Sequence, residues 1–274
     1  MRLAVYALSL AAVVAIGLSA MAAPVAMSGT YSQNFDGMGT GTAYPAGWAV
    51  YSISGSHDQF VPATPPTGND IKAGSAVTMV AVTGPTNQKA SNGYNFGLSA
   101  SSGDRALGTS PTGTAGMVLE LQLTNGLPYQ LTGFTINYDI RRFSTTTNNN
   151  TGYDGDSYKG IEELPGYRLF YSVDGGSTYT NVSALNPTIS GPTGVIMPNA
   201  TGVTSVPQTE ITFTSPLAAN GSLKLRWFDD NAQSPSPDQL IGLDNVTVTP
   251  VPEPATLTVV ALGGLTLLRR KSVR

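Results

Sequence analysis

Residues 119–123 read LELQL, so leucine alternates with a polar residue at every position. Successive side chains of a β-strand point to opposite faces, and this alternation predicts a strand with one buried face and one wet face. Glu120 and Gln122 are expected to face solvent. Residues 134–140, FTINYDI, repeat the period of two. These two stretches predict long strands of a layered β-protein.

The same alternation recurs along the chain, and each run is bounded by Gly, Pro or Asn. The further runs are residues 167–173, 211–213, 223–227 and 241–249. No stretch between the two ends shows the 3.6-residue stripe of an amphipathic helix. Many short strands on a chain of this length indicate an all-β fold, a two-sheet antiparallel β-sandwich of jelly-roll type.

The composition agrees with this fold class. The 274 residues include 31 Gly, 19 Pro and 32 Thr but only 5 Glu and 5 Lys, which excludes a helix bundle. A hydrophobic content of 41% supplies a core and argues against disorder. Charged residues make up only 11%, so Thr, Ser, Asn and Gly must cover much of the surface, as in many secreted proteins.

The N-terminus has the three parts of a secretory signal peptide. Arg2 gives a positive start, residues 3–18 are nearly all apolar, and Ala20 and Ala22 form a small-x-small cleavage site. Signal peptidase is expected to cut between Ala22 and Ala23. An uncleaved membrane anchor is the alternative, although the apolar run is short for a membrane span.

The C-terminus combines a proline-rich motif, an apolar run and a basic tail. Pro252, Glu253 and Pro254 precede the apolar residues 255–268. Fourteen helical residues rise about 21 Å, less than a hydrocarbon core of roughly 30 Å. Cations at the end can remain cytoplasmic and reach the headgroups, so we expect a single transmembrane helix. The basic tail comprises Arg269, Arg270, Lys271 and Arg274.

This order of elements resembles the PEP-CTERM sorting signal of Gram-negative bacteria that export proteins into a surface polysaccharide matrix. The resemblance implies that Pro252, Glu253 and Pro254 are recognised by an exosortase, with a transient inner-membrane anchor before release to the cell surface or matrix. A proline-rich linker before an ordinary anchor is the alternative. The expected organisation is a signal peptide at 1–22, a β-sandwich at 23–250 and the sorting signal at 251–274.

Charge and cysteine content exclude several classes of function. Without the two end segments the chain has 9 basic and 16 acidic residues, and its cations are scattered apart from the adjacent Arg141 and Arg142. Nucleic acid binding needs clustered cations and is therefore disfavoured. The absence of cysteine excludes disulfides, thiolate catalysis and cysteine-based zinc sites.

The body also resembles extracellular jelly-roll domains, including carbohydrate-binding modules. Residues 241–246, IGLDNV, are similar to their closing strand, and residues 34–37, NFDG, are similar to their opening. In several such modules a structural calcium ion ties the first strand to the last, which would nominate Asp36 and Asp244. Two carboxylates are too few for calcium without backbone carbonyls that a sequence cannot reveal.

Residues 172–179, SVDGGSTY, resemble the Asp-box, a hairpin signature found in sialidases and unrelated β-proteins. The expected role is structural. Asp174 should accept bonds from turn amides, Gly175 and Gly176 should adopt positive φ, and Tyr179 should pack beneath the hairpin.

Catalytic motifs are absent from the sequence. His57 is the only histidine, and the four glutamates of the body match no glycosidase pattern. Some loop-like aromatics are candidates for stacking on sugars. We therefore expect a non-enzymatic structural or adhesive protein that contacts extracellular polysaccharide; a calcium-stabilised carbohydrate-binding module is the alternative, and a polysaccharide-acting enzyme is third. The glutamates are Glu120, Glu162, Glu163 and Glu210, and the aromatics are Tyr44, Trp48, Tyr51, Tyr94 and Tyr153.

Overall fold

The computed structural model describes residues 23–55, 66–83, 91–97, 103–112, 114–144, 166–188, 194–196, 201–230 and 240–254. The predicted signal peptide, the apolar run and the basic tail lie outside these residues. Within them, no helix is long and apolar enough to cross a membrane.

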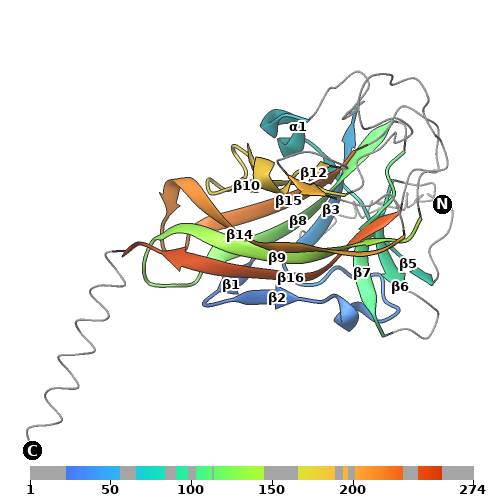
Figure 1. The fold of residues 1–274 in the computed structure, drawn as a ribbon, viewed down its shortest axis with the longest axis horizontal. Coiled ribbons are helices and arrows are strands. Elements are labelled where there is room, and N and C mark those ends of the chain that lie inside the picture. The colour runs from blue at the N-terminus through green and yellow to red at the C-terminus, as the bar shows by residue number, and fades with distance from the viewer. Residues whose placement is uncertain are drawn as a thin grey trace, which may run out of the picture.

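Two stacked sheets form the described part of the chain (Figure 1). Sheet A has the order β11-β10-β15-β8-β3-β4, with β1 paired to β8. Sheet B has the order β14-β9-β16-β7-β6-β5, with β2 paired to β16. The bounds in sheet A are β1 Val25–Met27, β3 Trp48–Ser54, β4 Ser75–Ala76, β8 Ala115–Asn125, β10 Arg168–Ser172, β11 Thr180–Asn181 and β15 Ser222–Asp229. Those in sheet B are β2 Tyr31–Gln33, β5 Met79–Thr83, β6 Gly93–Gly97, β7 Arg105–Thr109, β9 Leu131–Arg142, β14 Gly202–Leu217 and β16 Ile241–Pro252.

Short elements complete the described chain. The helix α1 spans Gly68–Lys72, and two 3₁₀ turns cover Asp36–Met38 and Ser183–Leu185. A small parallel pair joins β12, Pro187–Thr188, to β13, Val195–Ile196.

The β-sandwich prediction is confirmed, because each alternating run coincides with a strand of one of the two sheets, although β10 is one residue shorter at each end than the run 167–173. One detail differs from the expected antiparallel pairing. Strands β1 and β8 are parallel, as are β5 and β6, so both sheets are mixed.

The core fills the space between the sheets with aliphatic and aromatic side chains from both. Trp48 and Trp227 of sheet A stack at 5.5 Å between ring centroids, and Tyr138 of sheet B meets Trp227 edge-on at 5.9 Å. Leu121 and Ile136 are fully buried in the same cluster. Burying a large apolar side chain contributes roughly 1.5–3 kcal/mol, so this cluster supplies much of the drive to fold.

The expectation that Glu120 and Gln122 face solvent is wrong. Glu120 is 0% exposed and Gln122 is 7% exposed. Their face of sheet A is covered, because α1 places Ile71 in a second apolar cluster there. Glu120 is instead neutralised by Arg226, whose Nε lies 2.5 Å from the carboxylate.

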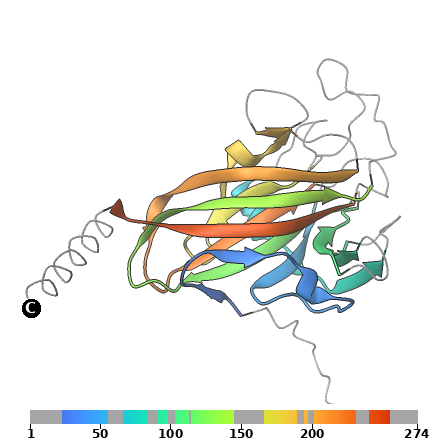
Figure 2. The same ribbon diagram turned by 60° about the horizontal axis from the view of Figure 1, so that its bottom comes forward.

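The last strand extends further than the expected domain boundary at residue 250. Val251 pairs with Gly133 and Pro252 with Leu131, so β16 includes the first two residues of the predicted sorting segment. Proline is tolerated at this position because it ends the strand, where a missing N–H costs little. Figure 2 shows β16, in red, lying between β9 and β2.

The Asp-box prediction is confirmed. Asp174 accepts bonds from the Thr178 backbone N–H at 3.0 Å and from its hydroxyl at 2.6 Å. Gly175 and Gly176 have φ of 74° and 94°. Although burial opposes ionisation, these bonds lower the pKa of Asp174 below its ordinary value. Tyr179 packs beneath the turn at 9% exposure.

Candidate functional site

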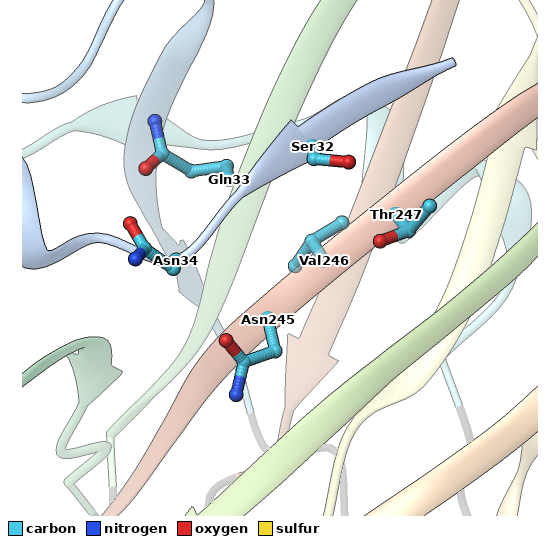
Figure 3. A pocket seen from close by; sticks show the side chains of 6 residues that line it. All are labelled: Ser32, Gln33, Asn34, Asn245, Val246 and Thr247. Carbon is cyan, nitrogen blue, oxygen red and sulfur yellow. The ribbon is translucent and has the colours of Figure 1, made fainter.

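A polar groove lies between β2 and β16 on the surface of sheet B (Figure 3). Its volume is about 370 Å³, within the range of small-molecule sites. Amide and hydroxyl side chains from the two strands dominate the lining. The lining residues are Ser32, Gln33, Asn34, Asn245, Val246 and Thr247. We call this feature the β2–β16 groove.

The groove covers two residue pairs, Ser32 with Thr247 and Gln33 with Val246, and the asparagines that follow them at the end of the β2–β16 pairing. Val246, Thr247 and Val248 pair in register with β2, while a register shift interrupts the pairing of β16 with β9 between Asp244 and Thr247. Asn245 lies in this irregularity with φ of 50°, a left-handed conformation that Asn tolerates better than most residues. The Asn245 side chain is exposed at the end of the groove (Figure 3), and its amide nitrogen bonds to Asp139 of β9, on the other side of β16 from β2.

Acidic neighbours fix the orientation of the two asparagine amides. The Asn245 amide nitrogen donates to an Asp139 carboxylate oxygen at 2.8 Å. The Asn34 amide nitrogen donates to Asp36 at 2.8 Å. These bonds settle which end of each amide is the donor, and the carbonyl oxygen of Asn245 remains available as an acceptor.

A charged network lies next to the groove. Arg141 forms two hydrogen bonds with Asp104, at 2.8 and 2.6 Å, and its Nη2 lies 2.5 Å from Asp244. Burial raises the pKa of Asp244 to about 6, even though Arg141 acts to lower it. Burial acts in the opposite direction on the pKa of Arg141, because it disfavours the charged guanidinium. The neighbouring Asp104 and Asp244 outweigh this effect and raise the pKa of Arg141 above its ordinary value. The cation in this network is therefore already shared by two carboxylates.

Asp36 and Asp244, the predicted calcium ligands, both lie beside the groove but are engaged by N–H donors. Asp36 accepts from the Arg105 backbone N–H at 3.0 Å and from Asn34. Asp244 accepts from the Asn245 backbone N–H at 2.7 Å and pairs with Arg141. No group of three or more metal-ligating side chains occurs among the described residues.

Calcium requires six to eight oxygen ligands, so this donor set does not fit the ion. The segment that carries Asp36 is already joined to the last strand, because β2, which directly precedes it, pairs with β16. Three of the candidates for stacking on sugars, Trp48, Tyr51 and Tyr94, are core residues at 0, 6 and 2% exposure and do not present a ring to solvent. Tyr44 is half-buried and donates its hydroxyl to the Val77 carbonyl at 3.0 Å, while Tyr153 lies outside the described residues.

Candidate catalytic acids are not assembled in the described part of the chain. Glu120 is committed to Arg226, and Glu210 is exposed on the edge strand β14. His57, Glu162 and Glu163 lie outside the described residues.

Sequence reasoning also missed the burial of Asp229. This residue is 0% exposed and accepts from the Thr109 hydroxyl at 2.5 Å. The Tyr167 hydroxyl lies 2.8 Å from the same Thr109 oxygen and donates to the Ile241 carbonyl at 3.1 Å. Burial and the nearby Asp229 charge raise the pKa of Tyr167 well above its ordinary value. This cluster joins the two sheets, because Thr109 lies in sheet B and Asp229 in sheet A.

Comparisons with known proteins found distant likenesses only. No family model and no curated protein matches the chain. A carbohydrate-binding module of family 61, solved with β-1,4-galactotriose, is 10% identical over 55% of this chain and 74% of its own, with a TM-score of 0.30. A cyclase from Fischerella sp. TAU is 17% identical over 82% of this chain and 100% of its own, with a TM-score of 0.36.

The C-terminal family 6 module of a laminarinase from Zobellia galactanivorans is 11% identical over 53% of this chain and 79% of its own, with a TM-score of 0.27. TM-scores this low transfer neither a ligand nor an activity. What can be said of this chain itself is that its described residues form a mixed two-sheet β-sandwich with a neutral, amide-lined groove between β2 and β16.

Proposed function

We propose that the chain is an exported, non-enzymatic surface or matrix protein whose β-sandwich contacts extracellular polysaccharide. The observation that carries the proposal is the β2–β16 groove, because its amide and hydroxyl groups match the donors and acceptors of a sugar and include no carboxylate. Acid–base chemistry on a glycosidic bond needs two carboxylates across a cleft, and the groove supplies none.

Binding is tested with the purified full-length chain and a panel of insoluble and soluble polysaccharides. We expect saturable co-sedimentation with at least one polysaccharide and no release of reducing ends. Failure to bind any member would overturn the contact role, whereas turnover would show that the protein is an enzyme.

Export and sorting form the second part of the proposal. Signal peptidase would cut after Ala22, and an exosortase would recognise Pro252, Glu253 and Pro254 while the tail holds the protein in the inner membrane. The end of β16 at Pro252 supports a short connection between the sandwich and the membrane. The released sandwich would then reside at the cell surface or in the matrix.

Sorting is tested by Glu253→Ala in a host that carries an exosortase, with Glu210→Ala as the matched control on an exposed strand position. We expect Glu253→Ala to remain in the membrane fraction and Glu210→Ala to be released like the original chain. Unchanged processing of Glu253→Ala would contradict the assigned motif.

A defined carbohydrate-binding module is the second candidate, and the fixed amides of the groove favour it. A module with a defined site binds short oligosaccharides that compete with the polymer, whereas diffuse association along a threonine-rich exterior does not. Competition by oligosaccharides therefore separates the two forms of the proposal.

A further inference from the structure

The β2–β16 groove is uncharged but surrounded by acids. Its lining side chains carry amide, hydroxyl or methyl groups, and none is ionisable. Asp139 holds Asn245 on one side of the groove, and Asp36 holds Asn34 on the other. Asp244 directly precedes Asn245 in β16. Carboxylates therefore flank the groove from three elements: the 3₁₀ turn after β2, strand β9 and strand β16.

The cation recorded in this network does not offset those acids. Arg141 contacts both Asp104 and Asp244, so its single positive charge faces two carboxylates. Arg105, whose backbone N–H bonds to Asp36, is a second cation near the groove. Among the described residues, four carboxylates, Asp36, Asp104, Asp139 and Asp244, therefore stand against two arginines. This balance is negative, in line with the 9 basic and 16 acidic residues of the body. An anionic ligand would approach against this charge, and repulsion between unpaired charges is strongest where solvent is partly excluded.

The two asparagine amides of the groove are held in place by hydrogen bonds. Asn245 is fixed by its Asp139 bond and by its left-handed backbone, which leaves its carbonyl oxygen as an acceptor. The hydroxyls of Ser32 and Thr247 lie opposite each other, because these residues are register partners. A fixed acceptor beside two hydroxyls suits adjacent hydroxyl groups of a sugar ring, and fixed groups lose little entropy on binding.

From this arrangement we infer that the groove binds an uncharged, hydroxyl-rich glycan segment and disfavours polysaccharides that carry uronic acid or sulfate. The inference rests on the proposed polysaccharide contact and specifies its ligand class. Binding of the neutral glycan should depend little on salt, because no ion pair forms. Any residual binding of a polyuronate should rise with salt as the repulsion is screened.

The test uses the full-length chain with neutral glucan, galactan, mannan and xylan, and with polygalacturonate and alginate, at low and high salt. Asn245→Gly removes the amide but keeps the positive φ that glycine tolerates. Asn220→Gly is the matched control, because Asn220 also has a positive φ, 60°, and lies in the turn before β15. Asp139→Asn removes a flanking charge while retaining an acceptor for the Asn245 amide.

We expect at least tenfold tighter binding of one neutral glycan than of either polyuronate. Asn245→Gly should weaken that binding at least fivefold and Asn220→Gly should leave it unchanged, with thermal melting confirming that both variants fold. Asp139→Asn should narrow the gap between neutral and anionic polymers. Equal or tighter binding of polyuronate would overturn the ligand class, and an unaffected Asn245→Gly variant would overturn the site. Failure to bind any polysaccharide would instead overturn the proposed function.

Discussion

Replacing Arg226 with Met tests whether the buried ion pair under α1 is as important as its geometry indicates. Arg226 pairs with Glu120 at 2.5 Å and donates to the Ile71 carbonyl of α1. Its guanidinium also lies over the rings of Tyr51 and Tyr179, at 4.6 and 4.9 Å from their centroids.

Arg226→Met should lower the free energy of unfolding, because it leaves the buried Glu120 carboxylate without its cation. Glu120 is fully buried, and removing one partner of a buried pair costs about 3–5 kcal/mol because the remaining charge is uncompensated. Two lost cation–π contacts add about 1 kcal/mol. A total of about 4–6 kcal/mol is a large part of an ordinary domain stability of 5–15 kcal/mol. Glu120→Gln should restore part of this loss in the double variant, because it removes the buried charge. The Gln carbonyl oxygen still accepts from one of the two tyrosine hydroxyls, which bond to different oxygens of Glu120.

The assay is urea unfolding of the full-length chain, followed by fluorescence of Trp48 and Trp227, which both lie in the core. Lys224→Met is the control, because Lys224 lies two residues from Arg226 on β15 and is half-exposed. Its effect should stay within about 0.5 kcal/mol. The reasoning fails if Arg226→Met costs less than 1 kcal/mol, or if the Glu120 and Arg226 effects simply add.

Three further predictions concern single sites. Because the folded pKa of Asp244, about 6, exceeds the ordinary 3.8, the folded chain binds the extra proton, and stability should fall as pH rises from 4 to 7. A shift of about two pKa units corresponds to roughly 3 kcal/mol, and solvent screening reduces the expected loss to about 1–2 kcal/mol. Urea titrations should show Asp244→Asn without this slope, and an equal slope would contradict the assignment. Calcium and chelator should give the same melting temperature, since Asp36 and Asp244 are engaged by N–H donors; a calcium-dependent rise would restore the metal site. Asp174→Ala should cost about 1–2 kcal/mol in chemical unfolding through its lost bonds to Thr178, and no loss would mean that the Asp-box turn is held by its glycines alone.

The strands could be predicted because their signal is local. Alternation within residues 134–140 is sufficient to assign a strand, since one face of β9 is buried and the other meets solvent or polar neighbours. The burial of Glu120 could not be predicted from the alternation, because it depends on α1, which comes about fifty residues earlier in the chain. A five-residue helix has too few positions to show a period.

The groove could not be predicted for a related reason. It depends on where β16 changes register, and a sequence does not display registers. The adjacent Asp244 and Asn245 were a usable signal, because Asn tolerates positive φ and often occupies an irregular strand position. Asp36 and Asp244, nominated by the resemblance as calcium ligands, both lie beside the groove. Their carboxylate oxygens accept hydrogen bonds from N–H groups in the structure.

The central position of β16 determines how the sandwich would respond to mechanical tension. The strand pairs with β9 from Ile241 to Pro252, where the sheet ends (Figure 1). A tether beyond Pro252 would pull β16 along its own axis, and ladder hydrogen bonds run across that axis. Such a pull would load the ladder hydrogen bonds together in shear instead of breaking them one by one, so a sandwich tethered there would resist extension.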